Sequence, residues 1–148
     1  MRKTLLSRRL QPDRPPPRWS LTHPAAPLTW DIQSRGKLAV VATVEGELDV
    51  DTAPGLSEQL VPLAAAGRHL ILNLAGVRFC DCAGLGLFLR LRKTVSASGG
   101  SLHLAAPTAP VRRLITVVRL GDLLPITDDP AELIAALNAA AAAGDPGS

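Results

Sequence analysis

Two short segments of this chain are apolar at nearly every position, and they constrain the fold more than any other feature. They are Leu38–Val44 and His69–Leu74. A strand with one face in water alternates apolar and polar residues, whereas a strand covered on both faces is apolar throughout. The first segment is therefore predicted to be a strand covered on both faces, and the second a buried central strand. Leu28–Gln33 and Ser101–Leu104 are two further expected strands.

Four further segments have the spacing of amphipathic helices. The first follows Thr52 as N-cap and has Pro54 in its first turn, and the second runs over Cys82–Ala97. The third begins at Thr108, and the fourth at a capping box that Asp129 opens. The residues predicted to face the core are Leu56, Leu60 and Leu63, then Leu87, Phe88, Leu91 and Val95, then Val111, Leu114, Ile115 and Val118, and last Leu133, Ile134 and Leu137.

Proline, glycine and acidic residues indicate where these elements end. Pro62 lacks the amide that a helix interior needs, so we expect a kink or an early end there, with closure at Gly67. Gly121 is expected to cap the third helix, and residues 45–49 to form an acidic turn. Turns at Ser34–Gly36 and elsewhere separate two strands and then alternating helices and strands, which predicts an α/β fold.

The length and composition favour one globular domain. The chain has 148 residues, of which 47% are hydrophobic and 20% are charged. Aromatic residues make up 3% and tyrosine is absent, so the core must consist of aliphatic side chains. The same shortage excludes an aromatic platform that stacks nucleic-acid bases. We expect the domain over residues 28–143 and a flexible C-terminus over residues 144–148.

Positive charge is concentrated before the predicted domain. Residues 1–27 have six basic residues against Asp13, a net charge of +5, whereas residues 28–148 have ten basic and twelve acidic residues, a net charge of −2. Six prolines between Gln11 and Pro27 disfavour regular structure. We predict a basic, disordered tail that is solvated or makes weak contact with nucleic acid or an anionic membrane. No direct nucleic-acid binding is assigned to the domain.

The sequence has no signal for a membrane or for secretion. No stretch approaches the ~20 apolar residues of a membrane span, and the N-terminus lacks a signal-peptide hydrophobic region. Cys80 and Cys82 are too close in sequence to link distant parts of a fold. Without a second Cys or His cluster they do not favour a zinc site. We expect a cytoplasmic protein with no metal and no cofactor.

The segment Phe79–Gly86, which reads FCDCAGLG, joins a predicted strand to the clearest predicted helix. Cys82 and Ala83 should lie at the helix N-terminus, where free amides and the helix dipole favour negative charge. Asp81 is well placed to cap the helix. The two glycines of the segment would let a partner or a neighbouring backbone come close.

This segment and several others resemble, in order and spacing, the STAS domain of anti-sigma factor antagonists. The matching segments are Val44–Asp49, Thr52–Ala53, Leu70–Val77, Phe79–Gly86, Gly99–Leu102, Ala106–Pro107, Val111–Leu114 and Gly121. The resemblance covers about residues 28–137. It implies a STAS-type α/β fold, with a mixed sheet of four to five strands and about four helices that lie on one side of the sheet.

In that family the antagonist binds a kinase that also holds a sigma factor, and the sigma factor is displaced. The kinase phosphorylates a Ser or Thr that follows the aspartate of the helix-start loop, and the added negative charge ends the binding. The resemblance thus implies a non-enzymatic regulatory protein whose partner is an anti-sigma factor or histidine-kinase-like ATPase. The residues that it implies for the contact are Glu47, Asp49, Asp51, Asp81, Cys82, Ala83, Gly84, Leu85 and Gly86.

Three residues depart from the family pattern. Cys82 occupies the phosphoacceptor position, Ala83 replaces a frequent second hydroxyl residue, and Asn73 stands where the strand usually has Asp. Because neither Cys nor Ala is a substrate of a Ser/Thr kinase, we expect this loop to escape phosphorylation. The protein would then bind its partner constitutively or be controlled by its abundance.

Cys82 itself allows three interpretations. It can be a small buried filler at a helix start, a regulatory thiol activated by the helix N-terminus, or a group with another role such as metal ligation with Cys80. The alternatives to sigma regulation are an accessory STAS scaffold of a transport or signalling complex and a thiol-based redox sensor. The oligomeric state is left open.

The other polar residues give no sign of catalysis. Glu47, Asp49 and Asp81 are explained as turn and cap residues with a partner-facing acidic surface rather than as acid–base carboxylates. The histidines at 23, 69 and 103 show no arrangement with a Ser or Cys nucleophile. Gly84–Gly86 is neither a phosphate-binding loop nor a dinucleotide fingerprint.

Overall fold

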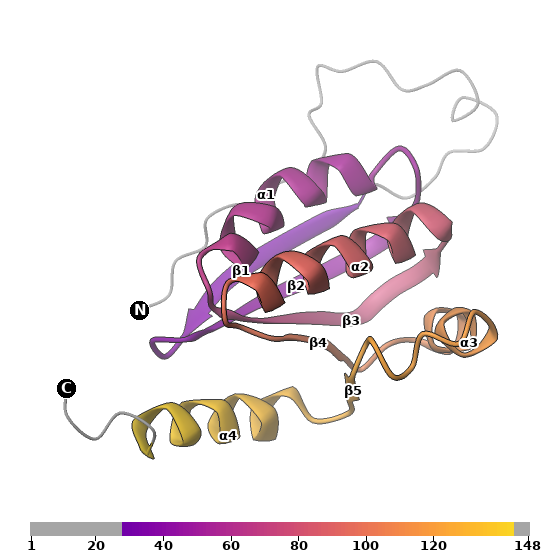
Figure 1. Ribbon diagram of the computed structural model, residues 1–148. Helices are drawn as coiled ribbons and strands as arrows, with labels where there is room; N and C mark the ends of the chain where they lie inside the picture. Colours follow the sequence, from indigo (N-terminus) through magenta and orange to yellow (C-terminus); the bar gives the residue numbers. More distant parts are fainter. Residues whose placement is uncertain (1–27, 144–148) are drawn as a thin grey trace, which may run out of the picture.

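A computed structural model describes residues 28–143 of the protein. In it, the two apolar runs form inner strands of one five-stranded sheet (Figure 1). The strands are β1 (Thr29–Arg35), β2 (Ala39–Leu48), β3 (His69–Cys80), β4 (Leu102–Ala105) and β5 (Ile126–Thr127). They lie in sequence order, with β1 antiparallel to β2 and every later pair parallel. The predicted mixed sheet of an α/β fold is confirmed. The predictions for residues 1–27 and 144–148 lie outside the described residues.

Four helices connect and cover these strands. They are α1 (Ala53–Ala65), α2 (Cys82–Ala97), α3 (Ala109–Val117) and α4 (Pro130–Ala143). The predicted capping by Asp129 is confirmed, since its Oδ1 accepts the amide of Glu132 at 3.1 Å and Pro130 takes the first helical position. Within residues 28–143, no helix has the length and apolar character needed to cross a membrane.

Helices cover both faces of the sheet, because alternate residues of the inner strands point to opposite sides. The larger core lies between the sheet and the pair α1 and α2, and its strand residues include Val40, Ala42, Val44, Leu70, Leu72 and Leu104. The residues between them point to the opposite face, where α4 packs with Leu133, Ile134 and Leu137 over Ala39, Val41, Ile71 and Ala105. Figure 1 shows α4 on the side of the sheet away from α1 and α2. The expectation of helices on one side is therefore wrong, whereas the two-sided apolar pattern of the strands is confirmed.

The inner strands β2 and β3 are longer than the sequence predicted. The acidic segment Glu45–Leu48 continues β2, and the turn comes after it; β3 continues past Leu74 to Cys80. The pairing of β2 with β3 shifts register between Thr43 and Glu45 and again between Gly46 and Glu47. Such bulges interrupt the alternation of side chains, so the pattern that reveals a strand is lost there.

Two helix ends and one predicted core residue differ from the expectations. α1 continues through Pro62 to Ala65 and closes at Gly67, whose φ is 77°. The left-handed residue that ends α3 is Arg119, with a φ of 58°, and not Gly121. Of the residues predicted to face the core, Val118 is exposed, whereas Leu63 packs against the core at intermediate burial.

Candidate functional site

Asp81 fixes the start of α2. Its Oδ1 accepts the amide of Ala83 at 2.8 Å and the amide of Gly84 at 3.3 Å. The extended backbone at Asp81, with φ −107° and ψ −168°, turns the carboxylate over the first turn of the helix. The predicted capping role is confirmed. Two of the amides that would attract a further anion are therefore already bound to a carboxylate.

The loop between β2 and α1, residues 49–52, is closed by its own side chains. Asp49 Oδ1 accepts the amides of Asp51 at 2.9 Å and Thr52 at 3.0 Å. The Thr52 hydroxyl donates to the Glu47 carbonyl at 2.8 Å and accepts the amide of Asp49 at 2.9 Å. Thr52 precedes α1 at the predicted N-cap position, but its side chain closes the loop and does not cap the helix. The Asp49 carboxylate is used within the loop, and Asp51 is left exposed.

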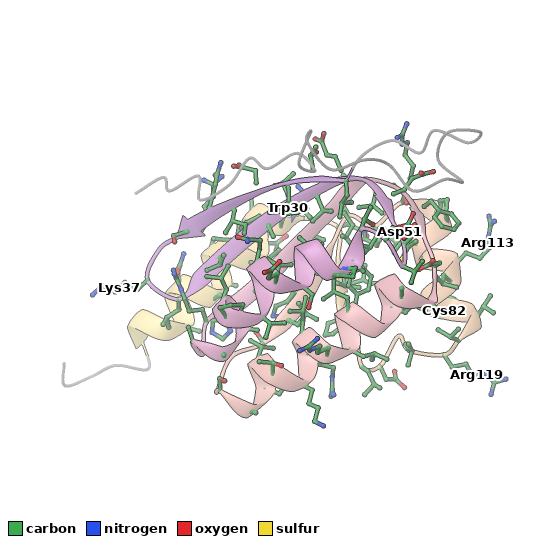
Figure 2. All side chains as sticks on the ribbon, turned by 90° about the horizontal axis from the view of Figure 1, so that it is seen from above. Trp30, Lys37, Asp51, Cys82, Arg113 and Arg119 are labelled. Atoms are coloured by element: carbon green, nitrogen blue, oxygen red, sulfur yellow. The ribbon has the colours of Figure 1, made fainter. Side chains whose placement is uncertain are left out.

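This loop and the start of α2 lie at the same end of the molecule. The amide of Asp81 donates to the Leu48 carbonyl at 3.1 Å and joins the ends of β2 and β3. The Thr108 hydroxyl donates to the Val77 carbonyl at 2.6 Å and ties the start of α3 to β3. Figure 2 shows Asp51 and Cys82 near one end of the molecule and Lys37 at the opposite end.

The two glycines of α2 have opposite surroundings. A Cβ at Gly84 would lie 3.0 Å from Leu48 Cγ and still closer to Cys80 Sγ, so only glycine lets the helix approach the strands this closely. At Gly86 a Cβ would meet no heavy atom within 4 Å. Gly84 therefore serves the packing of the domain, and Gly86 leaves open surface on the helix.

A groove of about 410 Å³ separates α1 and the preceding loop from α2. Its lining residues are Val50, Ala53, Pro54, Ser57, Ala83, Gly86, Leu87 and Arg90. Val50 is 67% exposed and adds an apolar side chain to the edge of the groove. Among the described residues, the one ion pair is that of Arg112 with Asp128, so the Arg90 guanidinium has no carboxylate partner. This groove is a mostly apolar surface with a free positive charge.

The structure divides the predicted contact residues into two groups. Cys82, Ala83, Gly86 and Asp51 reach the surface at this end, and Ala83 and Gly86 line the groove. Gly84 and Leu85 are buried, whereas Glu47, Asp49 and Asp81 are part-buried and Asp49 and Asp81 form hydrogen bonds within the loops. The contact role of all nine stays a prediction. The predicted contact residues did not include six residues that line the groove, although an apolar Val50 between acidic residues was a usable signal. These six are Val50, Ala53, Pro54, Ser57, Leu87 and Arg90.

The two cysteines lie in different environments. Cys80 is buried at the end of β3, and burial raises the pKa of its thiol to about 12, with a smaller contribution from the negative charges of Asp81 and Cys82. Cys82 is exposed at the start of α2. The interpretation of Cys82 as a buried filler is therefore wrong, and that description fits Cys80. The described residues hold no group of three or more His, Cys, Asp or Glu side chains suited to a metal ion.

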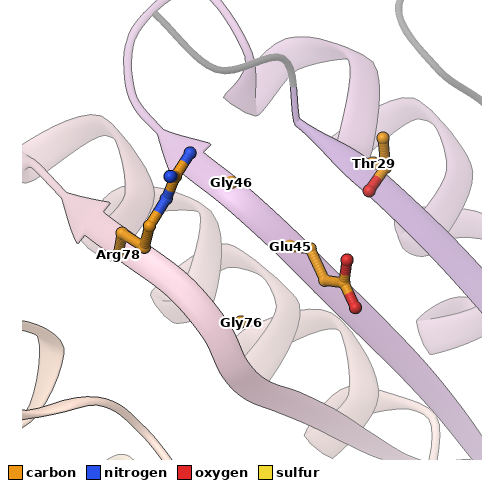
Figure 3. Close-up of a pocket in the computed structure, with 5 residues that line it drawn as sticks. All are labelled: Thr29, Glu45, Gly46, Gly76 and Arg78. Carbon is orange, nitrogen blue, oxygen red and sulfur yellow. The ribbon is translucent and has the colours of Figure 1, made fainter.

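A second hollow, of about 280 Å³, lies over β1, β2 and β3 (Figure 3). Its lining residues are Thr29, Glu45, Gly46, Gly76 and Arg78. The Glu45 side chain lies over Gly76, where a Cβ would come within 3.1 Å of Glu45 Cβ. This lining holds one carboxylate, one guanidinium and one hydroxyl, with neither imidazole nor thiol.

Comparison with known proteins identifies the family of this chain and its fold. Residues 29–133 match the family model of the STAS domain. The chain belongs to the STAS domain family. This STAS domain is 39% identical over 88 residues to the anti-sigma-B factor antagonist of Bacillus subtilis (strain 168), a match that covers 60% of this chain and 81% of the relative.

Two solved structures have the same fold as this STAS domain. The anti-sigma factor antagonist SpoIIAA in its unphosphorylated form has a TM-score of 0.66 at 22% identity, over 75% of this chain and 97% of that chain. An anti-sigma factor antagonist from Mycobacterium paratuberculosis has a TM-score of 0.66 at 23% identity, over 74% of this chain and 92% of that chain. At these identities the two likenesses show the fold, and they confirm the predicted STAS-type architecture.

The two helix glycines should respond in opposite ways to alanine. We expect Gly86→Ala to raise the free energy of unfolding by about 0.5–1 kcal/mol, because alanine is the better helix former and has room. Gly84→Ala should lower it by about 1–3 kcal/mol, because the new methyl group meets Leu48 and Cys80. Urea unfolding of both variants measures the difference, and equal changes at the two positions would contradict this account.

The two cysteines should differ in alkylation. At neutral pH, a thiol reagent should label Cys82 of the native protein and leave Cys80 unlabelled, because Cys80 is buried and its raised pKa keeps it protonated. Intact mass should show a single adduct, and Cys82→Ser should show none. Unfolding in urea should add a second adduct to the wild type. Labelling of Cys80 in the folded protein would overturn the assignment.

Proposed function

We propose that this STAS domain is a non-enzymatic anti-sigma factor antagonist that binds an anti-sigma factor of the histidine-kinase-like ATPase class and so frees a sigma factor. The observation that carries the proposal is the exposed surface formed by residues 49–52, the start of α2 and the groove between α1 and α2. The similarity to a curated anti-sigma-B factor antagonist over four fifths of that relative's length supports the same role.

The chemistry of this surface suits a protein partner. Val50 and the apolar walls of the groove can bury an apolar side chain of the partner, and Gly86 leaves room for its backbone. Asp51 is exposed on the loop, and Arg90, which pairs with no carboxylate of residues 28–143, stands in the groove wall. The groove lining holds one charged group and no imidazole, thiol or carboxylate. This composition supports binding rather than acid–base or nucleophilic chemistry.

Cys82 alters how such a surface is controlled. The side chain at the start of α2 is exposed, so a hydroxyl group at this position would be accessible to a kinase. The thiol is no substrate for Ser/Thr phosphorylation, and the adjacent Asp81 carboxylate already holds two helix-start amides. We propose that the domain is constitutively competent to bind and that its abundance sets the response.

A charge reversal in the groove should separate binding from folding. Arg90→Glu should weaken binding of the anti-sigma factor at least tenfold, because the groove loses its positive charge and gains a negative one. Lys93→Glu is the matched control, since Lys93 is exposed on the same helix and does not line the groove. Its binding should stay within about threefold of the wild type.

Titration calorimetry with the purified ATPase-fold protein from the same genome measures both variants. Equal losses of affinity for Arg90→Glu and Lys93→Glu would show that the partner does not contact the groove specifically. A wild-type domain that binds no such protein would overturn the proposed function itself.

The predicted loss of the phosphorylation switch can be tested by restoring the hydroxyl. After incubation with the kinase partner and ATP, the wild type should carry no phosphate within residues 81–87, and Cys82→Ser should gain one at position 82 because its side chain is exposed. Phosphopeptide mass spectrometry measures both proteins. Phosphate in this loop of the wild type would contradict the proposal.

A further inference from the structure

Two imidazoles and one hydroxyl form a hydrogen-bonded chain at the starts of β3 and β4. His69 Nδ1 lies 2.7 Å from Ser101 Oγ, and Ser101 Oγ lies 2.8 Å from His103 Nε2. β3 runs from His69 to Cys80, so this cluster lies at the end of β3 opposite the start of α2. The sequence analysis did not predict this contact, because parallel pairing of β3 with β4 brings together His69 and Ser101, which are 32 positions apart.

The cluster adjoins the contact between the sheet and α4. Its residues alternate with Leu70 and Leu102 of the larger core, so they face the α4 side. His103 pairs in register with Ile71, which α4 covers together with Ala105, two residues further along β4. A charge on His103 therefore develops beside the apolar surface on which α4 packs.

No carboxylate of the described residues contacts the two imidazoles to balance a second proton. The charged residues on the adjoining elements include Asp31, Arg35, Lys37, Arg68, Arg92, Lys93, Asp128, Asp129 and Glu132. Asp31 accepts a hydrogen bond from Gln33 Nε2 at 2.8 Å. Arg68 precedes His69 and reaches Ser34 Oγ and the Ala39 carbonyl, both at 3.4 Å. Asp128 pairs with Arg112, and Asp129 caps α4. Among the described side chains, no carboxylate forms a hydrogen bond or ion pair with either imidazole.

Proton counting shows what the shared hydroxyl can satisfy. With both rings neutral, Ser101 donates to one ring nitrogen and accepts the N–H of the other. With one ring charged, the chain is still complete, because the charged ring donates and the neutral ring accepts. With both rings charged, both nitrogens donate, the hydroxyl hydrogen loses its acceptor, and two positive charges flank one oxygen beside Arg68.

We propose that His69, Ser101 and His103 form a proton-sensitive clamp between β3 and β4, in which a second proton leaves the Ser101 hydroxyl hydrogen without its acceptor, sets two positive charges around one oxygen, and loosens α4 from the sheet. The clamp acts on the stability of the domain and does not depend on the proposed partner. It uses two imidazoles that the proposed binding surface leaves unused.

The direction of the pH dependence follows from His103. Burial and, second, the charge of His69 lower the pKa of His103 from its ordinary 6.5. An imidazole that binds its proton more weakly in the folded than in the unfolded chain makes the folded state less stable as the pH falls. This contribution to stability is complete above about pH 6.5 and is lost as the pH falls from there through the lower folded-state pKa.

Histidine-ring NMR of the full chain across pH 4.5–8 tests the clamp directly, with single His→Gln variants to assign the signals. The His103 midpoint should lie below 6.5 and should rise in His69→Gln, because the neighbouring charge is then absent. The Ile134 methyl signals should move over the same pH range, because Ile134 of α4 packs against the apolar cluster of the sheet that includes Ile71 and Ala105. A His103 midpoint at or above 6.5 in the wild type would overturn the proposal without need of any variant.

Urea unfolding at pH 7.5 and 5.5 provides the second test. The unfolding midpoint of the wild type should fall on acidification, and the fall should be smaller in His103→Gln. His23→Gln is the matched control, since it removes a histidine outside the described residues and should keep the fall of the wild type. An equal fall in His103→Gln and wild type would show that other groups cause the pH dependence and would reject the clamp.

Discussion

The first turn of α2 lies against the ends of β2 and β3 with no space for a side chain at position 84. The glycine brings the helix backbone onto Leu48 and Cys80, and Asp81 then caps the amides that this turn exposes. Cys82 is held at the surface as a consequence, because the residues on either side of it are fixed by the cap and by the close contact. The geometry of the proposed binding surface therefore depends on a packing contact inside the domain.

The proposed binding surface and the histidine cluster belong to opposite faces of the sheet. The face under α1 and α2 supports the groove and the loops at the carboxyl ends of β2 and β3, where the proposed partner binds. The face under α4 has a smaller apolar cluster and holds the histidines at the opposite ends of the strands. Because a strand directs alternate residues to opposite faces, β3 serves both layers without sharing a residue between them.

Much of the fold was predictable from local patterns. The run HLILNL predicted a buried strand, and the spacing of Leu87, Phe88, Leu91 and Val95 predicted α2 with its observed bounds. The missed portions of β2 and β3 contain bulges, where polar residues and glycines follow no alternation. The missed half of the groove comes from α1, whose outward residues carry no pattern that distinguishes a groove wall from ordinary surface. For the same reason, Arg90 was assigned only to the outer side of α2.

The sequence by itself determined the order of the four helices and the first four strands, the capping of α2 by Asp81 and the absence of a hydroxyl group at position 82, because these depend on neighbouring residues or on residue identity. The two-residue strand β5 was not predicted. Tertiary structure alone decided that Cys80 is buried and Cys82 exposed, although the two are separated by one residue. It also decided that α4 covers the second face of the sheet, and that Ser101 lies between His69 and His103. These outcomes depend on which distant strands pair and on which side a helix packs. Contacts between residues far apart in the chain decide both, and local sequence patterns do not encode them.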